Sequence, residues 1–438
     1  MTYAEAVARL LALRGGEHAG MRPGLERIEG LLSALGNPER RFTLVQVGGT
    51  NGKGSVAALL AAALQAAGRR VGLYTSPHLV SFRERIRVDG EPIPGDAVAD
   101  GVDALGTLVA RFDASMFEAT TALALDWFAS ADVEVAVLEV GLGGRLDATT
   151  VGRPAVTVLS AIDLDHQAYL GTTLAAIAAE KAAIIRAGLA LSAAQPSEAA
   201  AVVQARAAAA GVPLLVEGRD LHVRVERREP AAQWIRCAGP GWLLEGVELG
   251  LLGVFQPGNA LLAAAAARAL EVPEAAVRRG LARARWPGRF DVRPMREGGW
   301  LVLDGAHNPA GARALAASLA AWFPGRPLTL VLGVAGDKDA RAMLGTLVPL
   351  AERVVLTASS SARSASPAAL RTLLPGGPAH VDVAPSAAAA LEIAARPPRT
   401  PVVCVAGSLF LVGDVLRRLE GDKPCPIEKT AASMGSRF

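Results

Sequence analysis

A lysine stands in a loop of small residues near the start of the chain, in the sequence Gly48-Gly-Thr-Asn-Gly-Lys-Gly-Ser55. The apolar run Phe42–Val47 before the loop predicts a strand, and the Ala- and Leu-rich run Val56–Ala67 after it predicts a helix. Backbone N–H groups at a helix N-terminus favour anions, and the lysine adds a full positive charge. Glycines let the backbone close around phosphates without a Cβ in the way. This strand–loop–helix therefore predicts nucleotide binding, although Gly54 after the lysine departs from the usual consensus spacing.

Charged residues also follow other predicted strands. Glu139 lies near the end of the apolar run Val133–Val140, and a carboxylate there needs a cation or a hydrogen-bond donor to offset its burial. A magnesium ion that bridges nucleotide phosphates would be such a partner, because magnesium prefers oxygen ligands. A structural salt bridge with Arg145 is the alternative. His166 follows the strand predicted over Ala155–Ile162, and a lone histidine is more often a core or surface residue than a metal ligand.

Two further charged segments have equally ordinary alternatives. Glu180-Lys181 lies in a helix predicted over Thr173–Ala187, where the simplest interpretation is a solvated charge pair. The sequence Asp304-Gly-Ala-His-Asn-Pro309 ends a strand predicted over Trp300–Leu303 and opens a helix. It has the polar, glycine-containing form of a site loop, and a helix-capping turn is the alternative.

The elements that must position these residues alternate between strand and helix patterns, which predicts an α/β fold with mainly parallel sheets. From Leu221 to Leu249 short alternating segments with turn residues predict a β-meander. The sequence Trp286-Pro-Gly-Arg-Phe290 interrupts the pattern, and α/β alternation restarts after it. We therefore predict a domain boundary near residue 287. The further predicted strands are 70–75, 189–193, 212–216, 328–333, 353–357 and 402–406.

Composition excludes several classes of protein. The 438 residues are 51% hydrophobic and 20% charged with a net charge of +3, a balance that favours a folded protein without a nucleic-acid partner. No signal peptide or membrane-spanning stretch is evident, so we expect a cytoplasmic protein that does not bind membranes. The three cysteines are too far apart in sequence to indicate a disulfide framework or a zinc site. The polar tail 421–438 is expected to be disordered.

Taken together, the motifs resemble those of the Mur ligase superfamily, and most closely its folate branch of folylpolyglutamate synthases and bifunctional dihydrofolate synthases. The similar segments occur in the family's order from about residue 20 to residue 418. They are Gly49–Ser55, Tyr74-Thr-Ser-Pro-His-Leu79, Phe117-Glu118, Glu139-Val-Gly-Leu-Gly-Gly-Arg-Leu-Asp-Ala-Thr149, Leu164-Asp-His166, Glu180-Lys181, Pro287-Gly-Arg-Phe-Asp291, Asp304–Pro309, Asp337-Lys-Asp339 and Gly407-Ser408.

The resemblance implies an N-terminal nucleotide-binding α/β domain over residues 1–286 and a smaller Rossmann-like α/β domain over residues 287–420. It also implies an ATP-dependent ligase that adds L-glutamate to dihydropteroate, to the γ-carboxylate of reduced folates, or to both. In that reaction the acid attacks the γ-phosphate to give an acyl phosphate, and the amine of glutamate then displaces phosphate. Both steps develop negative charge on oxygen, which suits a cationic loop and a metal. A monomer is expected.

The family's site residues carry over by position. The resemblance implies two magnesium ions bound with ATP and a carbamylated lysine, Lys181, which with His307 is catalytic. The implied ATP-binding residues are Thr50, Asn51, Gly52, Lys53, Gly54, Ser55, Asn259, Arg289 and Asp304. The implied metal ligands are Ser76, Glu139 and His166, and the implied folate-binding residues are Ser115, Met116, Phe117, Glu118, Asp147, Ala148 and Thr149.

Two other functions remain open from the sequence. A cell-wall Mur ligase usually carries an N-terminal domain for its nucleotide-linked substrate, and the phosphate loop begins here by residue 48. A nucleotide-dependent switch or regulatory ATPase is the second alternative. Against it, the chain has no guanine-reading Asn-Lys-x-Asp sequence, and a second α/β domain with its own site loop suits two-substrate chemistry.

Overall fold

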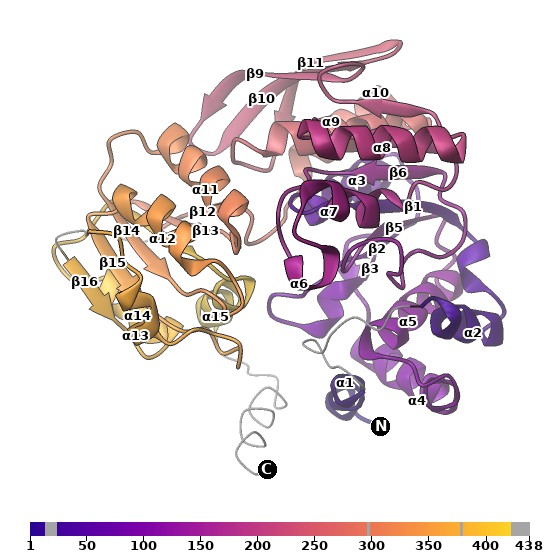
Figure 1. The fold of residues 1–438 in the computed structure, drawn as a ribbon, viewed down its shortest axis with the longest axis horizontal. Coiled ribbons are helices and arrows are strands. Elements are labelled where there is room, and N and C mark those ends of the chain that lie inside the picture. Colours follow the sequence, from indigo (N-terminus) through magenta and orange to yellow (C-terminus); the bar gives the residue numbers. More distant parts are fainter. Residues whose placement is uncertain (14–23, 296–297, 377–379, 422–438) are drawn as a thin grey trace. The chain divides into compact units, whose positions relative to one another are not determined.

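The computed structural model describes residues 1–13, 24–295, 298–376 and 380–421. The chain divides into two compact units, each considered by itself. The first comprises Met1–Glu226, Trp234–Leu249 and Pro257–Ala284, and the second comprises Arg227–Gln233, Gly250–Gln256 and the chain from Arg285 onward. In Figure 1 the first unit runs mainly from indigo to magenta and the second from orange to yellow. From residue 422 onward, the tail that was expected to be disordered lies outside the described residues.

An eight-stranded sheet forms the centre of the first unit, in the order β4-β3-β2-β5-β1-β6-β7-β8. Strands β2, β5, β1, β6, β7 and β8 are parallel, and β3 and β4 extend one edge in antiparallel pairing. The strands are β1 (Thr43–Gly48), β2 (Val71–Tyr74), β3 (Ile86–Val88), β4 (Glu91–Pro92), β5 (Val135–Glu139), β6 (Val156–Leu159), β7 (Leu189–Ser192) and β8 (Leu214–Val216). Because β1 lies between β5 and β6, the segments that follow these three strands meet at one edge of the sheet.

The helices of the first unit are α1 (Tyr3–Ala12), α2 (Glu26–Ala34), α3 (Lys53–Ala66), α4 (Gly95–Arg111), α5 (Met116–Ser130), α6 (Gln167–Leu170), α7 (Leu174–Ala182), α8 (Ser197–Ala210), α9 (Gln256–Ala269) and α10 (Glu274–Arg283). Helix α3 is buried along almost its whole length, between the sheet and α10. A Cβ on Gly280 of α10 would lie 2.4 Å from backbone atoms of Ala63, so glycine permits this close helix crossing. The phosphate loop is thus anchored to a helix that cannot move without opening the core.

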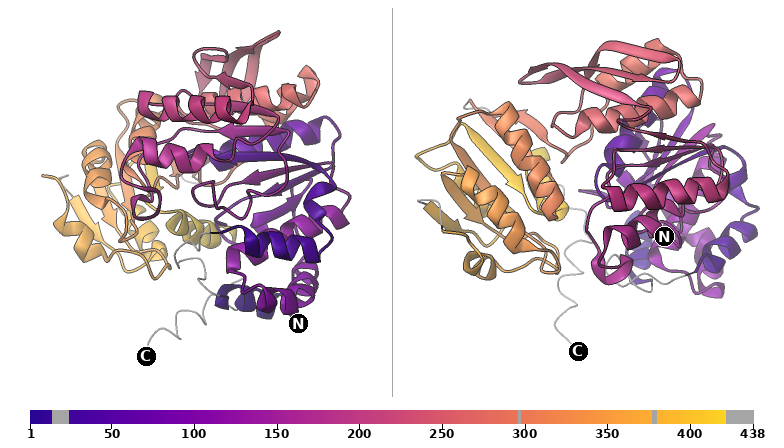
Figure 2. Two further views of the ribbon diagram at one scale, coloured as in Figure 1. Left: turned by 45° about the vertical axis from the view of Figure 1, so that its right-hand side comes forward. Right: turned by 45° about the horizontal axis from the view of Figure 1, so that its top comes forward.

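The predicted β-meander is present as a three-stranded antiparallel sheet of β9 (His222–Glu229), β10 (Ala232–Gly239) and β11 (Trp242–Leu249). Strand β11 packs against α10, and Figure 2 shows the sheet on the side of the first unit that carries α9 and α10. Residues of β10 alternate between more and less buried positions. This alternation is the pattern of a sheet that covers a core with one face.

The second unit has a six-stranded sheet in the order β12-β13-β17-β14-β15-β16, in which only the β12–β13 pair is antiparallel. Its strands are β12 (Asp291–Pro294), β13 (Trp300–Leu303), β14 (Leu328–Leu332), β15 (Arg353–Leu356), β16 (His380–Val383) and β17 (Val402–Ala406). Its helices are α11 (Pro309–Trp322), α12 (Ala340–Leu347), α13 (Pro367–Thr372), α14 (Ala387–Ala394) and α15 (Leu409–Glu420). Apolar side chains of the sheet, α11 and α12 form its core.

The α/β class with mainly parallel sheets is confirmed, while several boundaries differ from those predicted. Helix α3 begins at Lys53 and not at Val56, so the loop lysine is the first residue of the helix. The helix predicted to reach Ala187 ends at Ala182. Across the described ranges, no helix is both long enough and apolar enough to cross a bilayer.

Candidate active site

The loop between β1 and α3 has a shape that only glycine allows at two positions. Gly49 has φ +137°, and a Cβ there would lie 2.0 Å from Ser160 Oγ. Gly52 has φ +95°, and a Cβ there would lie 2.5 Å from Asn259 Oδ1. L-residues rarely adopt these backbone conformations, so both positions require glycine, for its backbone conformation and because there is no space for a Cβ.

Other residues of the loop hold it against the segment that follows β6. The N–H groups of Thr50 and Asn51 both donate to the carbonyl of Ala161, at 2.8 and 3.2 Å. The Thr50 hydroxyl donates to the carbonyl of Asp163 at 3.0 Å. In this structure these groups fix the loop, while the first turn of α3, which begins at Lys53, supplies N–H groups without intrahelical acceptors. That turn is the part of the loop suited to bind phosphate.

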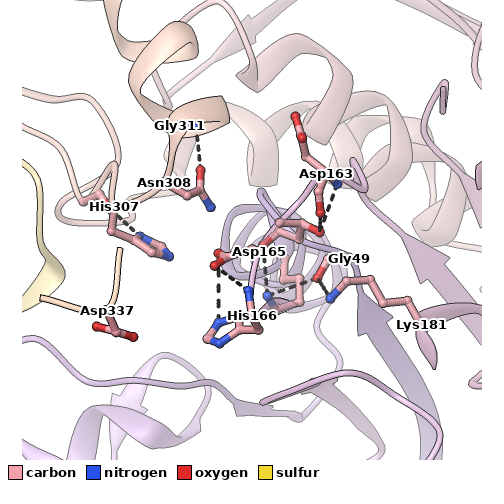
Figure 3. Close-up of polar contacts among 12 residues, drawn as sticks. Gly49, Asp163, Asp165, His166, Lys181, His307, Asn308, Gly311 and Asp337 are labelled. Atoms are coloured by element: carbon pink, nitrogen blue, oxygen red, sulfur yellow. Dashed lines mark hydrogen bonds and ion pairs between the residues drawn. The ribbon is translucent and has the colours of Figure 1, made fainter. Parts of the chain in front are cut away.

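Two lysines from distant parts of the chain donate to one carbonyl oxygen. Lys53 Nζ lies 3.3 Å from the Gly49 oxygen and 3.2 Å from that of Thr50. Lys181 Nζ of α7 lies 2.9 Å from the same Gly49 oxygen, as Figure 3 shows. Lys181 is buried, with 5% of its surface exposed, so the interpretation of a solvated helical lysine is wrong.

Burial, and next the positive charge of Lys53, lower the pKa of Lys181 to about 7. The carboxylates of Asp165 and Asp147 act in the opposite direction. A large share of Lys181 is therefore a neutral amine near pH 7, and a neutral amine is nucleophilic where an ammonium ion is not. The site thus combines one charged lysine with one that readily loses its proton.

Glu180, next to Lys181, has a structural role. Its carboxylate pairs with Arg145 at 2.9 Å, and its carbonyl accepts the N–H of Arg145 at 2.9 Å. A Cβ on Gly144 would lie 2.7 Å from the same Glu180 carbonyl, so the segment after β5 packs tightly on α7. Arg145 therefore pairs with Glu180, and the suggested salt bridge between Arg145 and Glu139 is not what the structure has.

Glu139 is buried at the end of β5, directly beside β1. Its Oε2 accepts the N–H of Ser76, which follows β2, at 3.1 Å. His166 follows β6 on the other side of β1, and its side chain is 38% exposed and 4.0 Å from the Asp165 carboxylate. In the described ranges, no three His, Cys, Asp or Glu side chains converge on one metal position. A hydroxyl, a carboxylate and an imidazole at neighbouring strand ends nevertheless form a donor set that suits a metal whose remaining ligands are phosphate oxygens and water.

The segments assigned to folate differ in how far their side chains are exposed. Ser115 caps α5 and forms a capping box with Glu118. Glu118 is buried and accepts Arg27 Nε at 2.9 Å, and Met116 is also buried. Phe117 is partly exposed, and its ring leaves no room for a Cβ on Gly141.

The segment Asp147–Thr149 is buried as well. Burial raises the pKa of Asp147, although its carboxylate accepts the N–H groups of Leu142 and Thr149. Gln46 of β1 donates to the hydroxyls of Thr149 at 3.3 Å and Thr150 at 2.8 Å. This network connects the strand that leads into the phosphate loop with the folate segment.

In the second unit, Asp304 and Arg289 lie close together. Asp304 accepts the N–H groups of Phe290 at 2.7 Å and Ala306 at 2.8 Å, and a Cβ on Gly305 would lie 2.4 Å from Arg289 Nη1. Burial raises the pKa of Asp304 to about 6, although the charge of Arg289 and the two backbone donors lower it. Asp304 therefore holds the turn that carries Arg289.

The segment that follows is both a polar loop and a helix cap. Asn308 Oδ1 accepts the N–H of Gly311 at 2.8 Å and caps α11, which begins at Pro309 (Figure 3). His307 Nδ1 lies 2.7 Å from the Gly305 carbonyl. A carbonyl only accepts, so Nδ1 carries a proton, and neutral His307 keeps Nε2 as an acceptor.

Sequence reasoning missed Gln46 and Arg27. Gln46 is a buried polar residue in an otherwise apolar strand, which was a usable signal. Arg27 pairs with Glu118, which is 91 positions away in the sequence, and no local sequence pattern predicts such a contact.

Comparisons with known proteins show the family of the chain. The family description "Mur ligase middle domain" matches residues 47–267, and "Mur ligase, glutamate ligase domain" matches residues 288–409. The chain is 38% identical over 403 residues to a dihydrofolate synthase/folylpolyglutamate synthase of Mycobacterium tuberculosis, covering 85% of this chain and 82% of that protein.

The chain belongs to the Mur ligase family. Within that family it belongs to the branch of folylpolyglutamate and dihydrofolate synthases, and it is an ATP-dependent ligase. A crystal structure of the Mycobacterium tuberculosis folylpolyglutamate synthase with ADP superimposes on this Mur ligase with a TM-score of 0.88, at 36% identity and 96% and 99% coverage of the two chains. A probable bifunctional folylpolyglutamate synthase/dihydropteroate synthase of Haloferax volcanii is 40% identical over 430 residues, and the chain spans only 50% of that protein's length.

Proposed function

We propose that this Mur ligase adds L-glutamate to dihydropteroate, to the γ-carboxylate of reduced folates, or to both, through an acyl phosphate. The observation that carries the proposal is the pair of lysines, Lys53 and Lys181, on the carbonyl of Gly49, which follows β1, the strand that pairs with β5 and its buried Glu139. Lys53 supplies a positive charge at the end of β1, where a triphosphate would bind, and Lys181 supplies an amine that readily loses its proton. The rest of the proposal rests on the family and on the position of each residue.

ATP is proposed to bind with its phosphates against the first turn of α3, among Thr50, Asn51, Gly52, Lys53, Gly54 and Ser55. Lys53 is the fixed cation of this loop, and negative charge that develops on the γ-phosphate strengthens its interaction in the transition state. Asn259, Arg289 and Asp304 are proposed to bind the adenosine part. His307, as a neutral imidazole with an accepting Nε2, is proposed to act near the phosphates.

Ser76, Glu139 and His166 would hold magnesium, and the proposal is two ions bound with ATP. A bound ion would neutralise phosphate oxygens as negative charge moves onto them. The buried Glu139 supplies a full negative charge, and its hydrogen bond from the Ser76 N–H orients the carboxylate. His166 contributes a nitrogen, which magnesium accepts only where the protein imposes the geometry.

Lys181 is proposed to be carbamylated. Its neutral amine attacks carbon dioxide, a bond forms between Nζ and carbon, one C=O electron pair moves to oxygen, and the nitrogen releases a proton. The lowered pKa supports this step, because about half of the amine is unprotonated near pH 7. The product is an anion beside Lys53, which replaces the repulsion between two cations by attraction. Lys181 would in this form help to position the metal.

The folate substrate is proposed to bind at Ser115, Met116, Phe117, Glu118, Asp147, Ala148 and Thr149. The partly exposed Phe117 ring suits contact with a flat pteridine, because aromatic faces stack favourably. The buried members would act by holding the segments in place. Glu118, for example, accepts hydrogen bonds from Arg27 and from the N–H of Ser115, which fixes the start of α5.

Parallel product analysis tests the proposal. Purified protein is given ATP, magnesium and glutamate, with dihydropteroate in one reaction and tetrahydrofolate in the other, and products are identified by mass. A glutamylated product in either reaction supports the proposal and says which acid is used. A nucleotide-dependent switch would hydrolyse ATP without forming a product. Gel filtration with light scattering tests the predicted monomer, and fractionation of cells tests the predicted cytoplasmic location.

A further inference from the structure

Glu217 has no part in the function proposed above, yet its carboxylate lies where three segments meet. It directly follows β8, and its Oε2 accepts the N–H of Ala194, which follows β7, at 3.2 Å. A Cβ on Gly258, in the first turn of α9, would lie 3.2 Å from Glu217 Oε1. Among the residues that the structure describes, Oε1 has no hydrogen-bond donor and Glu217 has no ion-pair partner.

The neighbours of Glu217 connect it to the phosphate loop. Gly258 immediately precedes Asn259, whose Oδ1 lies where a Cβ on Gly52 would be. The amide of Asn259 therefore lies beside the phosphate loop, and the carboxylate of Glu217 lies beside the preceding residue of the same helix turn. A nucleotide that starts at Gly52 and continues along α9 reaches Glu217.

The order of the sheet places Glu217 on the side of β1 that carries β6, β7 and β8. Ligands of open α/β sheets bind beyond the carboxyl ends of the strands. On one side of β1, the ends of β5 and β2 carry Glu139 and Ser76, and on the other side His166, the third proposed metal donor, follows β6. Beyond β6 the order continues with β7 and β8, so a nucleoside that extends from the phosphate loop past β6 reaches the end of β7 and then Glu217.

We propose that Glu217 Oε1 accepts a hydrogen bond from the 6-amino group of adenine and so makes the enzyme select ATP. This specificity role rests on the proposed use of ATP. Inosine triphosphate differs from ATP at this position, because it carries a 6-oxo acceptor that a carboxylate repels. A purely structural role is the alternative, since a negative charge near the start of α9 also stabilises that helix.

Replacing Glu217 by glutamine tests the proposal. The amide oxygen of Glu217→Gln still accepts the N–H of Ala194, while its NH₂ group faces the base as a donor. We expect kcat/KM for ATP to fall about ten- to a hundred-fold, the range for losing a hydrogen bond to a charged group. We expect kcat/KM for inosine triphosphate to rise, so that the preference for ATP falls at least tenfold. An unchanged preference overturns the proposal.

A matched control removes a carboxylate from another helix start. Glu198 is exposed in the first turn of α8, and Glu198→Gln should leave the preference for ATP unchanged. Gly258→Ala is a second variant that keeps the charge of Glu217 and presses a methyl group against Oε1. We expect it to lower the preference for ATP severalfold, so the proposal stays testable even where Glu217→Gln does not fold.

Direct binding separates this proposal from the proposed function. Calorimetry with ATP and with inosine triphosphate needs neither folate nor glutamate. Wild-type protein that binds ATP more tightly, together with a Glu217→Gln variant that does not discriminate, supports the role of Glu217 even where no ligation occurs. Wild-type discrimination that survives in Glu217→Gln overturns this inference alone. Failure of the wild type to bind either nucleotide overturns both.

Discussion

Replacing Lys53 by methionine should raise the pKa of Lys181. Their Nζ atoms lie 3.3 and 2.9 Å from the Gly49 carbonyl oxygen, so the two nitrogens are at most about 6 Å apart. Two unit charges at roughly that distance repel by about 0.7 kcal/mol in a water-like dielectric and about 3 kcal/mol at the effective dielectric near a protein surface. That energy corresponds to a pKa rise of roughly 0.5 to 2. Burial persists in the variant, so the pKa should stay below the ordinary value of 10.5.

The assay is competitive labelling of lysines with a small acylating reagent across a pH series, read by mass spectrometry in carbon-dioxide-free buffer. In the wild type the labelling of Lys181 should have its midpoint near pH 7. The midpoint should move upward in Lys53→Met and stay in place in Lys53→Arg, which keeps the charge. Lys338, in the other unit, serves as an internal reference.

Two results would contradict this prediction for Lys181. A wild-type midpoint near the ordinary value for lysine would mean that burial does not favour the neutral amine. An equal midpoint in the wild type and Lys53→Met would mean that Lys53 is not the second cause of the lowered pKa. Either result would remove the physical support for carbamylation of Lys181.

Three further predictions concern the metal, the loop and the second unit. Glu139→Gln should weaken magnesium–nucleotide binding and nearly abolish turnover, and unchanged magnesium titrations in both Glu139→Gln and His166→Ala would contradict the metal site. Gly52→Ala should lower ATP affinity at least about tenfold, because the new Cβ would collide with the side chain of Asn259. Gly68→Ala is the control, because Gly68 has a similar positive φ and open space where the Cβ would lie, and it should leave ATP affinity unchanged. Asp304 has a pKa raised to about 6, so its contribution to stability is full below its unfolded pKa and lost as the pH rises through 6. The difference in the free energy of unfolding, Asp304→Asn minus wild type, should therefore rise by up to about 3 kcal/mol between pH 3.5 and pH 7. Denaturant titrations at several pH values measure this difference, and a difference that stays constant with pH would be evidence against the burial of Asp304.

The phosphate loop and the strands around it could be predicted from the sequence. A continuous apolar run before a glycine-rich segment indicates a buried parallel strand, and β1 and β5 both have this form. The two edge strands of the second sheet, β12 and β16, were missed for a physical reason. Strand β12, Asp291–Pro294, contains two charges and a proline, and β16, His380–Val383, is only partly buried, so neither has an apolar run that propensity can detect.

The chemistry of individual side chains was harder to predict, because it depends on contacts between distant parts of the chain. Lys181 is separated by 132 residues from Gly49, and only the folded chain buries its amine beside Lys53. From sequence the same lysine has the features of a solvated helical residue. The start of α3 was predicted from its first apolar residue, whereas Gly52 in the left-handed conformation sets it three residues earlier. Local patterns thus located the loop, and long-range packing determined what its lysines do.

The central claim is that ATP is consumed to join an acid to glutamate. Phosphate release measured with ATP, magnesium and each substrate alone, and then with both, tests it most directly. We expect phosphate release above background only when glutamate and either dihydropteroate or tetrahydrofolate are present together, with one glutamyl product formed per phosphate. Equal phosphate release without glutamate, with no new amide product, would contradict it.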